Sequence, residues 1–466
     1  MNYFNSLVRC DNGLTFIDRT SSNLLTYFNG RLSYDNVTFY STTPSSTLTE
    51  IITNTSRKLI IPSDQPILVI DEDLNLLRRK PKQGDTILRL RQETIGCKSH
   101  INLPKLSEKK QKQKYDFIDE IPLDSHFGYL NGVYIGDGWV SDTEVKHAIC
   151  LASEDSVIPS KVKEIIDRYL KKEKLHISCV PNVHEYEGKE SYSEKHTWHS
   201  DQFARYLKDN IGTGQGAINK RLPYYWTETS DSYRWGLLAG LIDTDGSIMK
   251  NYQKEQIGVN YTTISEELAN NIIRLAGSLN LTATITYSKT PKGKDCYYIT
   301  FTQESLLKMK GKLPLIKKWE ALKEFIPKET HDRNKYTPKL SDSRLSELRA
   351  VIGSPRLKSR KGTPLFRTTT EEQIIRDKRS LYQILYRVKH DNSAITKNTA
   401  RSILNLGLDI MNDPFWRKWE ELSTTDLYDW ELITKIIPYE SPVPLNVYKA
   451  DLEEAQALVD SNGIIY

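Results

Sequence analysis

One short glycine-rich pattern occurs twice in this chain of 466 residues. The first copy reads FGYLNGVYIGDG over residues 127–138, and the second reads WGLLAGLIDTDG over residues 235–246. The leading aromatic residue, both early glycines, one leucine and the final Asp-Gly pair coincide when the copies are aligned. Two unrelated buried helices with ordinary exit turns would rarely match at so many positions. The pattern therefore predicts a duplicated half-domain in which two equivalent helices pair.

Two glycines in each copy lie four residues apart, so each pair occupies one face of a helix. These glycines are Gly128, Gly132, Gly236 and Gly240. A helical glycine costs about 1 kcal/mol relative to alanine, and we therefore expect two helix backbones that approach closely. Asp137 and Asp245 should then lie at the C-terminal ends, with Gly138 and Gly246 as C-caps.

A carboxylate is electrostatically unfavourable at the negative end of a helix dipole. Two such carboxylates side by side, Asp137 and Asp245, also repel each other. A divalent cation between them would remove both penalties. The pattern thus predicts a metal site shared by the two helix ends.

Residues 238–246, LAGLIDTDG, resemble the LAGLIDADG motif of homing endonucleases nearly letter for letter. Residues 130–138, LNGVYIGDG, are similar to the looser first motif of single-chain members with two motifs. The resemblance implies an α+β protein with a pseudo-twofold αββαββα core. It further implies a monomeric enzyme that cleaves double-stranded DNA with Mg²⁺.

The resemblance also implies particular catalytic residues. Asp137 and Asp245 would bind Mg²⁺, with the backbone carbonyls of Gly136 and Thr244 completing the coordination. Lys220 matches the Lys-x-x-Pro context of the family's first lysine, and either Lys318 or Lys317 would be the second. Two further acids lie beside the motifs: we expect Asp243 to face elsewhere and Asp142 to assist the first site.

DNA recognition in such a protein would come from antiparallel strands that line the major groove, extended by basic segments. The expected contacts are Lys146, Lys250, Asn251, Lys254, Lys289, Lys292, Arg356, Lys358, Arg360 and Lys361. The last four belong to a stretch from 353 to 367 that carries no acidic residue. The net charge of +5 is too small to identify a nucleic-acid partner by itself.

The cysteines are scattered without a Cys-x-x-Cys pair, which fits a reducing compartment and predicts no zinc site. His196 and His199 lack nearby partners of metal spacing in the sequence. No signal peptide, transit peptide or long apolar run is evident, so we expect an intracellular protein, in the cytoplasm or nucleoid of a bacterium or phage-infected cell, or in a nucleus.

Four regions are expected along the chain. Residues 1–118 would be β strands and a lysine-rich linker, and 119–330 the duplicated core, with halves 119–225 and 226–330. Residues 331–425 would be an accessory DNA-contact region, polar to about 370 and helical beyond, in which 395–404 favours a helix-turn-helix or a structural bundle equally. Residues 426–466 return to a β pattern.

The two β regions resemble the halves of an intein splicing domain, the Hint fold. IIPSDQPILVI at 60–70, WELITKI at 430–436 and NVY at 446–448 carry this resemblance, and the layout is similar to intein-encoded endonucleases and the yeast mating-type switching endonuclease. Several groups that splicing needs are replaced. The substituted positions are Met1, Pro62, Gln65, Lys449, Gln456 and the final Tyr466. We therefore expect a splicing-inactive Hint-like domain on a free-standing protein.

Two other functions remain open from the sequence. A DNA- or RNA-binding protein that kept the fold without cutting, such as a maturase or regulator, would share the motifs. A splicing-competent intein would share the β pattern at both ends. The presence of both terminal acids, Asp137 and Asp245, favours cleavage.

Overall fold

The computed structural model describes most of the chain. The described residues are 23–28, 31–45, 48–55, 58–90, 98–104, 115–142, 147–186, 189–212, 216–251, 256–289, 293, 295–323, 336–353, 370–425, 428–439, 445–452 and 457–458. No helix within these ranges is both long and apolar enough to span a membrane.

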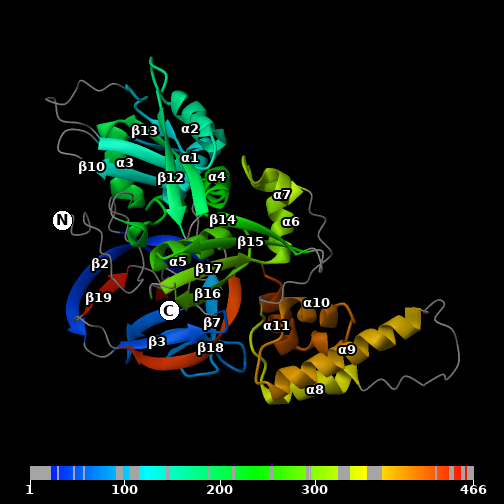
Figure 1. Cartoon of the computed structure of the whole chain (residues 1–466). Helices are drawn as coiled ribbons and strands as arrows, with labels where there is room; N and C mark the ends of the chain where they lie inside the picture. The colour runs from blue at the N-terminus through cyan, green and yellow to red at the C-terminus, as the bar shows by residue number, and fades with distance from the viewer. Residues whose placement is uncertain are drawn as a thin grey trace, which may run out of the picture. The chain divides into compact units, whose positions relative to one another are not determined.

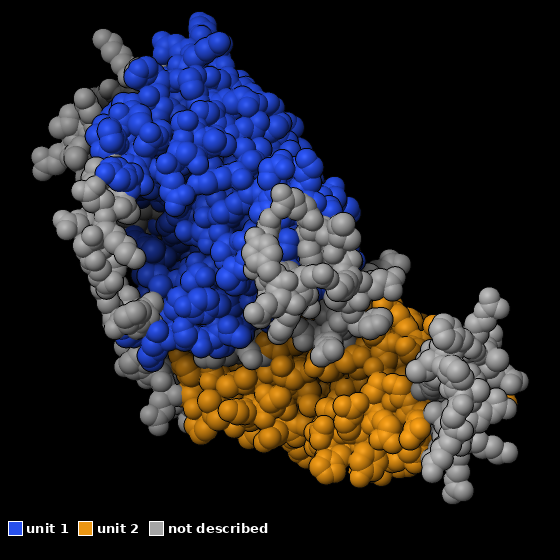
Figure 2. Space-filling view, turned by 45° about the vertical axis from the view of Figure 1, so that its right-hand side comes forward, with its two compact units in different colours: residues 1–7, 18–21, 92–330 blue, residues 8–17, 22–91, 331–466 orange. Residues whose placement is uncertain are grey.

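The chain divides into two compact units, which Figure 2 shows in different colours. Unit 1 consists mainly of residues 92–330, and unit 2 mainly of residues 22–91 and 331–466. Unit 2 is thus built from both ends of the chain, and unit 1 lies between them in the sequence.

The first half of unit 1 is a helix, two strands, a helix, two strands and a helix. Its elements are α1 (Ser125–Gly136), β10 (Gly138–Asp142), β11 (His147–Ser153), α2 (Val157–Asp167), β12 (Ser178–Tyr186), β13 (Lys189–His199) and α3 (Asp201–Ile211). The strands form an antiparallel sheet in the order β10-β11-β13-β12. Just before α1, the short strands β8 (His100–Ile101) and β9 (Ile121–Pro122) pair.

The second half repeats this arrangement. Its elements are α4 (Asp231–Asp243), β14 (Gly246–Asn251), β15 (Gln256–Thr263), α5 (Glu266–Ser278), β16 (Ala283–Lys289), β17 (Asp295–Phe301), α6 (Gln303–Lys312) and α7 (Trp319–Lys323). The sheet order β14-β15-β17-β16 matches the first half element for element. The expected mixed αββαββα core is therefore present, and Figure 1 shows α1 beside α4.

The α1–α4 contact is a backbone contact made possible by the four glycines. A Cβ added to Gly128 would lie 2.1 Å from the Tyr233 carbonyl oxygen, and one added to Gly236 would lie 2.0 Å from that of Ser125. A Cβ added to Gly132 would lie 2.3 Å from the Leu237 carbonyl oxygen, and one added to Gly240 would lie 2.3 Å from that of Tyr129. The contacts interchange when the two helices are exchanged, so the helices pack with pseudo-twofold symmetry.

Gly138 and Gly246 do not act as left-handed C-caps, contrary to the sequence prediction. Neither glycine has a positive φ, and each begins the strand that follows its helix. A Cβ at Gly138 would lie 2.7 Å from the Tyr134 carbonyl oxygen, and one at Gly246 would lie 2.6 Å from that of Ile242. These positions require glycine because the strand leaves directly over the preceding helical turn.

The helix α2 is short and spans Val157–Asp167. Pro159 lies in its first turn, where a missing N–H is tolerated. Beyond the helix, Leu170 pairs as an isolated bridge with Phe117. The chain therefore leaves the helix early to pack beside the segment that precedes α1.

Unit 2 contains two sheets that mix strands from both ends of the chain. The strands are β1 (Asn23–Phe28), β2 (Arg31–Ser45), β3 (Leu48–Thr53), β4 (Lys58–Pro62), β5 (Ile67–Ile70), β6 (Leu76–Arg79), β7 (Thr86–Leu90), β18 (Tyr428–Tyr439), β19 (Leu445–Leu452) and β20 (Ala457–Leu458). The orders are β4-β3-β18-β7-β5-β6 and β19-β2-β1-β20. Thus β18 pairs with both β3 and β7, although more than 300 residues separate them in sequence.

The helices of unit 2 share a core with these strands. They are α8 (Asp342–Ile352), α9 (Thr370–His390), α10 (Lys397–Leu404) and α11 (Pro414–Thr424). Leu345 and Leu348 of α8 are buried with Trp416 and Trp419 of α11 and Trp430 of β18. The region expected to be polar up to about residue 370 therefore contains a helix with a buried face, and the helical region packs with the β strands of its unit.

Buried charges connect these helices to the strands. The Arg89 side chain contacts Asp429, and its Nε lies 2.9 Å from a carboxylate oxygen of Glu431. Lys397 of α10 is also buried, and its Nζ lies 3.6 Å from Asp429. Removing one member of such a cluster leaves an uncompensated buried charge, so this cluster fixes α10 against β7 and β18.

We predict that Gly240→Ala destabilises unit 1 by about 2–3 kcal/mol, because the new methyl group overlaps backbone that cannot move aside. The matched control is Gly311→Ala in α6, where an added Cβ meets nothing within 4 Å. The free energy of unfolding of that control should rise by up to about 1 kcal/mol, because alanine has a higher helix propensity than glycine. Urea unfolding followed by circular dichroism measures both changes. Equal stabilities for Gly240→Ala and the wild type would contradict the packing described here.

Candidate functional site

The two helices end against each other on the pseudo-twofold axis. Gly136 and Thr244 occupy equivalent positions, and a Cβ on Gly136 would lie 2.0 Å from the Thr244 Oγ1. That hydroxyl donates to the Gly240 carbonyl at 2.8 Å, which turns it back along its own helix. The next residue on each side is an acid, so this contact brings Asp137 and Asp245 to one place.

The charge of Asp245 acts on Asp137. Removal from water and, next, the charge of Asp245 together raise the pKa of Asp137 to about 6, against the opposing effect of the lysines. Desolvation also raises the pKa of Asp245, which keeps more solvent contact and accepts a hydrogen bond from Tyr261 Oη at 3.3 Å. No described residue donates a hydrogen bond to the Asp137 carboxylate. The pair therefore retains acceptor capacity for a cation.

Lys220 reaches this place from the loop before α4. Its Nζ donates to the carbonyl of Gly136, the residue before Asp137. Burial lowers the pKa of Lys220, and the charges of Asp245 and Asp137 act in the opposite direction. The structure thus brings this predicted residue to the acidic pair.

Lys318 reaches the other helix end from the loop between α6 and α7. Its Nζ donates to the carbonyls of Ile242 and Thr244, each at 2.8 Å, and of Gly246 at 2.6 Å. Burial lowers the pKa of this lysine. Lys317 instead pairs with Glu154 at 3.2 Å and Asp155 at 3.3 Å. Lys318, and not Lys317, therefore lies against the end of α4.

The donor set fits a hard divalent cation through its carboxylates. Mg²⁺ takes one or two protein carboxylates and otherwise keeps waters or phosphate oxygens, which matches Asp137 and Asp245. The carbonyls of Gly136 and Thr244, predicted as further ligands, already accept hydrogen bonds from Lys220 and Lys318. The structure thus leaves the two carboxylates as the readily available donors.

Asp243 has a role that the sequence did not reveal. Its side chain is buried and accepts hydrogen bonds from the backbone of Ile316 and Lys318 and from Tyr129 Oη. It therefore faces away from the acidic pair, as expected, and toward the loop that carries Lys318. The side chain of Asp142 lies outside the described residues.

Few of the side chains predicted to contact DNA lie among the described residues. Lys289 is exposed at the end of β16, where its Nζ lies 3.2 Å from Asp295. Lys250 and Asn251 end β14, and their side chains are outside the described part. Wholly outside the described residues are Lys146, Lys254, Lys292, Arg356, Lys358, Arg360 and Lys361.

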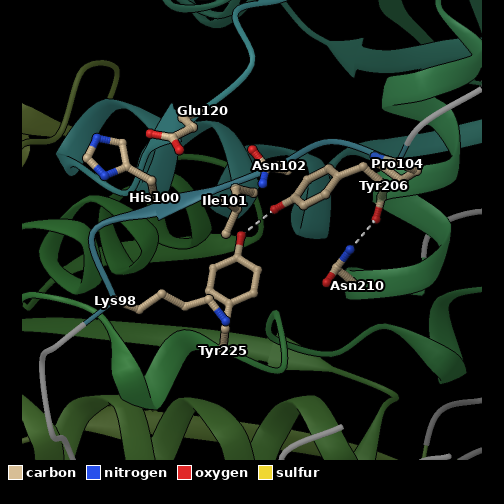
Figure 3. A pocket seen from close by; sticks show the side chains of 9 residues that line it. All are labelled: Lys98, His100, Ile101, Asn102, Pro104, Glu120, Tyr206, Asn210 and Tyr225. Carbon is tan, nitrogen blue, oxygen red and sulfur yellow. Dashed lines mark hydrogen bonds between the residues drawn. The ribbon is translucent and has the colours of Figure 1, made fainter. Parts of the chain in front are cut away.

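Two other features of unit 1 do not include the candidate residues: a cluster of side chains that could hold a metal ion, and a pocket. Cys179 and Glu194 have ligand atoms within 4.8 Å of His196, although no partner was expected for that histidine. Because Cys179 and His196 are cross-strand partners, this proximity depends on sheet register, and a 3.0 Å hydrogen bond from His196 to Glu194 holds the group together. Figure 3 shows the second feature, a pocket of about 430 Å³ whose lining includes Lys98, Tyr206 and Tyr225 but neither acid of the pair.

Comparisons with known proteins give one family match, which lies within unit 1. Residues 232–313 match the sequence model of the LAGLIDADG-like domain. Over 207 residues, 44% of this chain, the sequence is 29% identical to the ATP-dependent DNA helicase Hel308 of Thermococcus kodakarensis, of which this covers 17%. Over 224 residues, 46% of this chain, it is 24% identical to an uncharacterized protein of Methanocaldococcus jannaschii, of which this covers 23%. The chain spans less than a quarter of the length of these relatives.

Solved structures with similarity include homing endonucleases. One is a mesophilic variant of I-DmoI, with 12% identity, a TM-score of 0.30, and coverage of 43% of this chain and 98% of the other. Another is I-WcaI bound to its DNA recognition sequence, with 12% identity, a TM-score of 0.34, and coverage of 49% and 97%. A third is the N-terminal LAGLIDADG domain of WhiA, with 12% identity, a TM-score of 0.29, and coverage of 48% and 100%.

We predict that Asp137→Asn raises the melting temperature of the metal-free protein at neutral pH, by roughly 2–4 °C for each kcal/mol of stability gained by a domain of this size. The folded state prefers the protonated acid, so ionisation destabilises it increasingly as pH rises from the unfolded pKa near 3.8 through the folded pKa of about 6. The advantage of the variant should shrink when the same melts are recorded at about pH 4.

The control for this measurement is Asp209→Asn, which changes an exposed acid on α3. Its melting temperature should equal that of the wild type at both pH values. A melting temperature of Asp137→Asn below that of the wild type in chelator at neutral pH would contradict the description of the acidic pair.

Proposed function

We propose that this chain is a site-specific DNA endonuclease that makes a Mg²⁺-dependent double-strand break. The observation that carries the proposal is the convergence of Asp137 and Asp245 at the ends of α1 and α4, each beside a partly buried lysine. The match of residues 232–313 to the LAGLIDADG-like domain supports it. A protein that only bound nucleic acid would gain nothing from keeping two mutually repelling acids.

Hydrolysis of a phosphodiester requires an activated water and relief of charge on the leaving oxygen. Divalent metal held by Asp137 and Asp245 would supply both. Lys220 and Lys318 keep positive charge beside each helix end, where it can orient water or offset the charge that develops on phosphate. One acid and one lysine per half fit the cleavage of one strand by each half.

The outer face of the second-half sheet is suited to reading base edges. The core face carries Val259, Tyr261 and Ile299, all buried. The opposite face alternates with it and consists mainly of polar, uncharged side chains. These include Ser247, Asn260, Thr262, Thr284, Thr286 and Thr300. A two-stranded or larger β surface fits the major groove, where such side chains distinguish base pairs. We propose this face as a recognition surface for double-stranded DNA.

We propose further that unit 2 is a Hint-like domain without splicing activity. Strands from both ends of the chain share its sheets, as a domain interrupted by an endonuclease requires. Gln65, which stands where the resemblance expects a histidine, donates its amide to the Pro66 carbonyl at 3.3 Å. A side-chain amide does not gain or lose charge near neutral pH, so this position offers no general acid or base to activate a peptide bond.

Cleavage should be measured with purified protein, Mg²⁺ and a plasmid library of randomised target sites, with linear ends captured and sequenced. We expect discrete cut sites for the wild type. Asp137→Asn and Asp245→Asn should lose cleavage but keep specific binding to the selected site, because the outer sheet face is unchanged. The exposed control Asp209→Asn should cut normally. Full cleavage by either of the first two variants would refute the assignment.

The splicing proposal is tested by fusing a marker domain to each end of the chain. We expect the fusion to remain one polypeptide on a denaturing gel, because Gln65 and Pro62 replace groups that splicing uses. Joined marker domains together with a released 466-residue product would show an active intein instead.

A further inference from the structure

We infer that the two catalytic lysines are positioned by different structural devices, and that Asp243 is the positioning residue for Lys318 alone. The two DNA strands would then be cut by half-sites that single substitutions can disable separately. This inference rests on the proposed endonuclease function and adds to it the control of each strand.

Asp243 connects the end of α4 to the loop that carries Lys318. Its Oδ2 accepts from the Ile316 backbone N–H at 2.7 Å and from Tyr129 Oη at 3.0 Å. Its Oδ1 accepts from the Lys318 backbone N–H at 2.9 Å. Asp243 is only 2% exposed, and a carboxylate can accept at both oxygens. It therefore holds in place a loop that has no regular secondary structure.

Because its backbone is held, the Lys318 side chain approaches the end of α4 from a fixed direction. With its backbone held against Asp243, its Nζ reaches the carbonyls of Ile242, Thr244 and Gly246, which surround the last turn of the same helix. Asp243 and Asp245 thus have different roles, although they lie within one helical turn. Asp243 binds the backbone of the loop that carries Lys318, and Asp245 belongs to the acidic pair.

The first half cannot use this device. The residue equivalent to Asp243 is Ile135, which is completely buried and apolar. The residue equivalent to Tyr129 is Leu237. The pseudo-twofold symmetry of the helices therefore does not extend to the contacts that hold the lysines.

Lys220 is held instead by the second half of the unit. Its backbone carbonyl accepts from Ser265 Oγ at 2.8 Å, at the start of α5. Two residues further, the Leu222 N–H donates to Asn271 Oδ1 at 3.2 Å, and Asn271 is 3% exposed. None of these contacts involves Asp243, so a change at Asp243 should leave Lys220 in place.

The test uses a duplex target carrying different labels on its two strands, with cleavage rates measured for each strand. Lys318→Met first identifies the strand that depends on Lys318. Asp243→Asn should slow that strand by roughly tenfold or more, since one acceptor becomes a donor that faces an N–H. The other strand should keep its rate, and nicked plasmid should accumulate. Asn271→Leu should slow the opposite strand, the one slowed by Lys220→Met.

Equal slowing of both strands by Asp243→Asn would overturn the inference while leaving the endonuclease function intact. Absence of cleavage by the wild-type protein on any selected target would overturn the proposed function, and this inference with it. Binding of the target and the melting temperature are measured for every variant. If Asp243→Asn does not fold, Tyr129→Phe removes one of the three hydrogen bonds, and a shift of the strand ratio in the same direction is required.

Discussion

The structure of unit 1 depends on direct contact between the backbones of α1 and α4. At each of the four symmetric glycines, a carbonyl oxygen of the other helix lies only 2.0–2.3 Å from the position that a Cβ would take. Both helices are buried on nearly all sides, so side-chain packing around them offsets the low helix propensity of glycine. The close approach continues to the contact between Gly136 and Thr244, which holds the two helix ends together, and hence Asp137 and Asp245.

The electrostatics of the helix ends follow from this geometry. The carboxylates of Asp137 and Asp245 lie at adjoining helix C-termini, where the dipoles disfavour negative charge and the charge of Asp245 acts on Asp137. Lys220 and Lys318 offset part of this penalty, although their ammonium groups bind backbone carbonyls rather than the carboxylates. The acids therefore remain available to a cation, and the folded state carries their repulsion when none is bound. Such stored repulsion is common where binding or catalysis requires it.

Much of this arrangement could be predicted from the sequence because it is local or repeated. The duplicated motif predicted the paired helices α1 and α4, and the family resemblance predicted the αββαββα order of each half. Other features depend on register or on distant loops. The choice between Lys318 and Lys317 depends on which of two adjacent residues in an irregular loop turns inward. The role of Asp243 depends on backbone donors more than 70 residues away, and the proximity of Cys179 to His196 depends on the pairing of β12 with β13. The requirement for glycine at 138 and 246 was predicted correctly but for the wrong reason, because sequence does not show how a strand leaves its helix.

The metal site at the helix ends can be observed by anomalous diffraction from crystals of the protein grown with Mn²⁺ and its selected DNA target. We predict a metal peak within bonding distance of carboxylate oxygens of both Asp137 and Asp245, at the junction of α1 and α4. Ordered DNA on the sheets with no metal at this junction, or with the two carboxylates turned into separate environments, would contradict it.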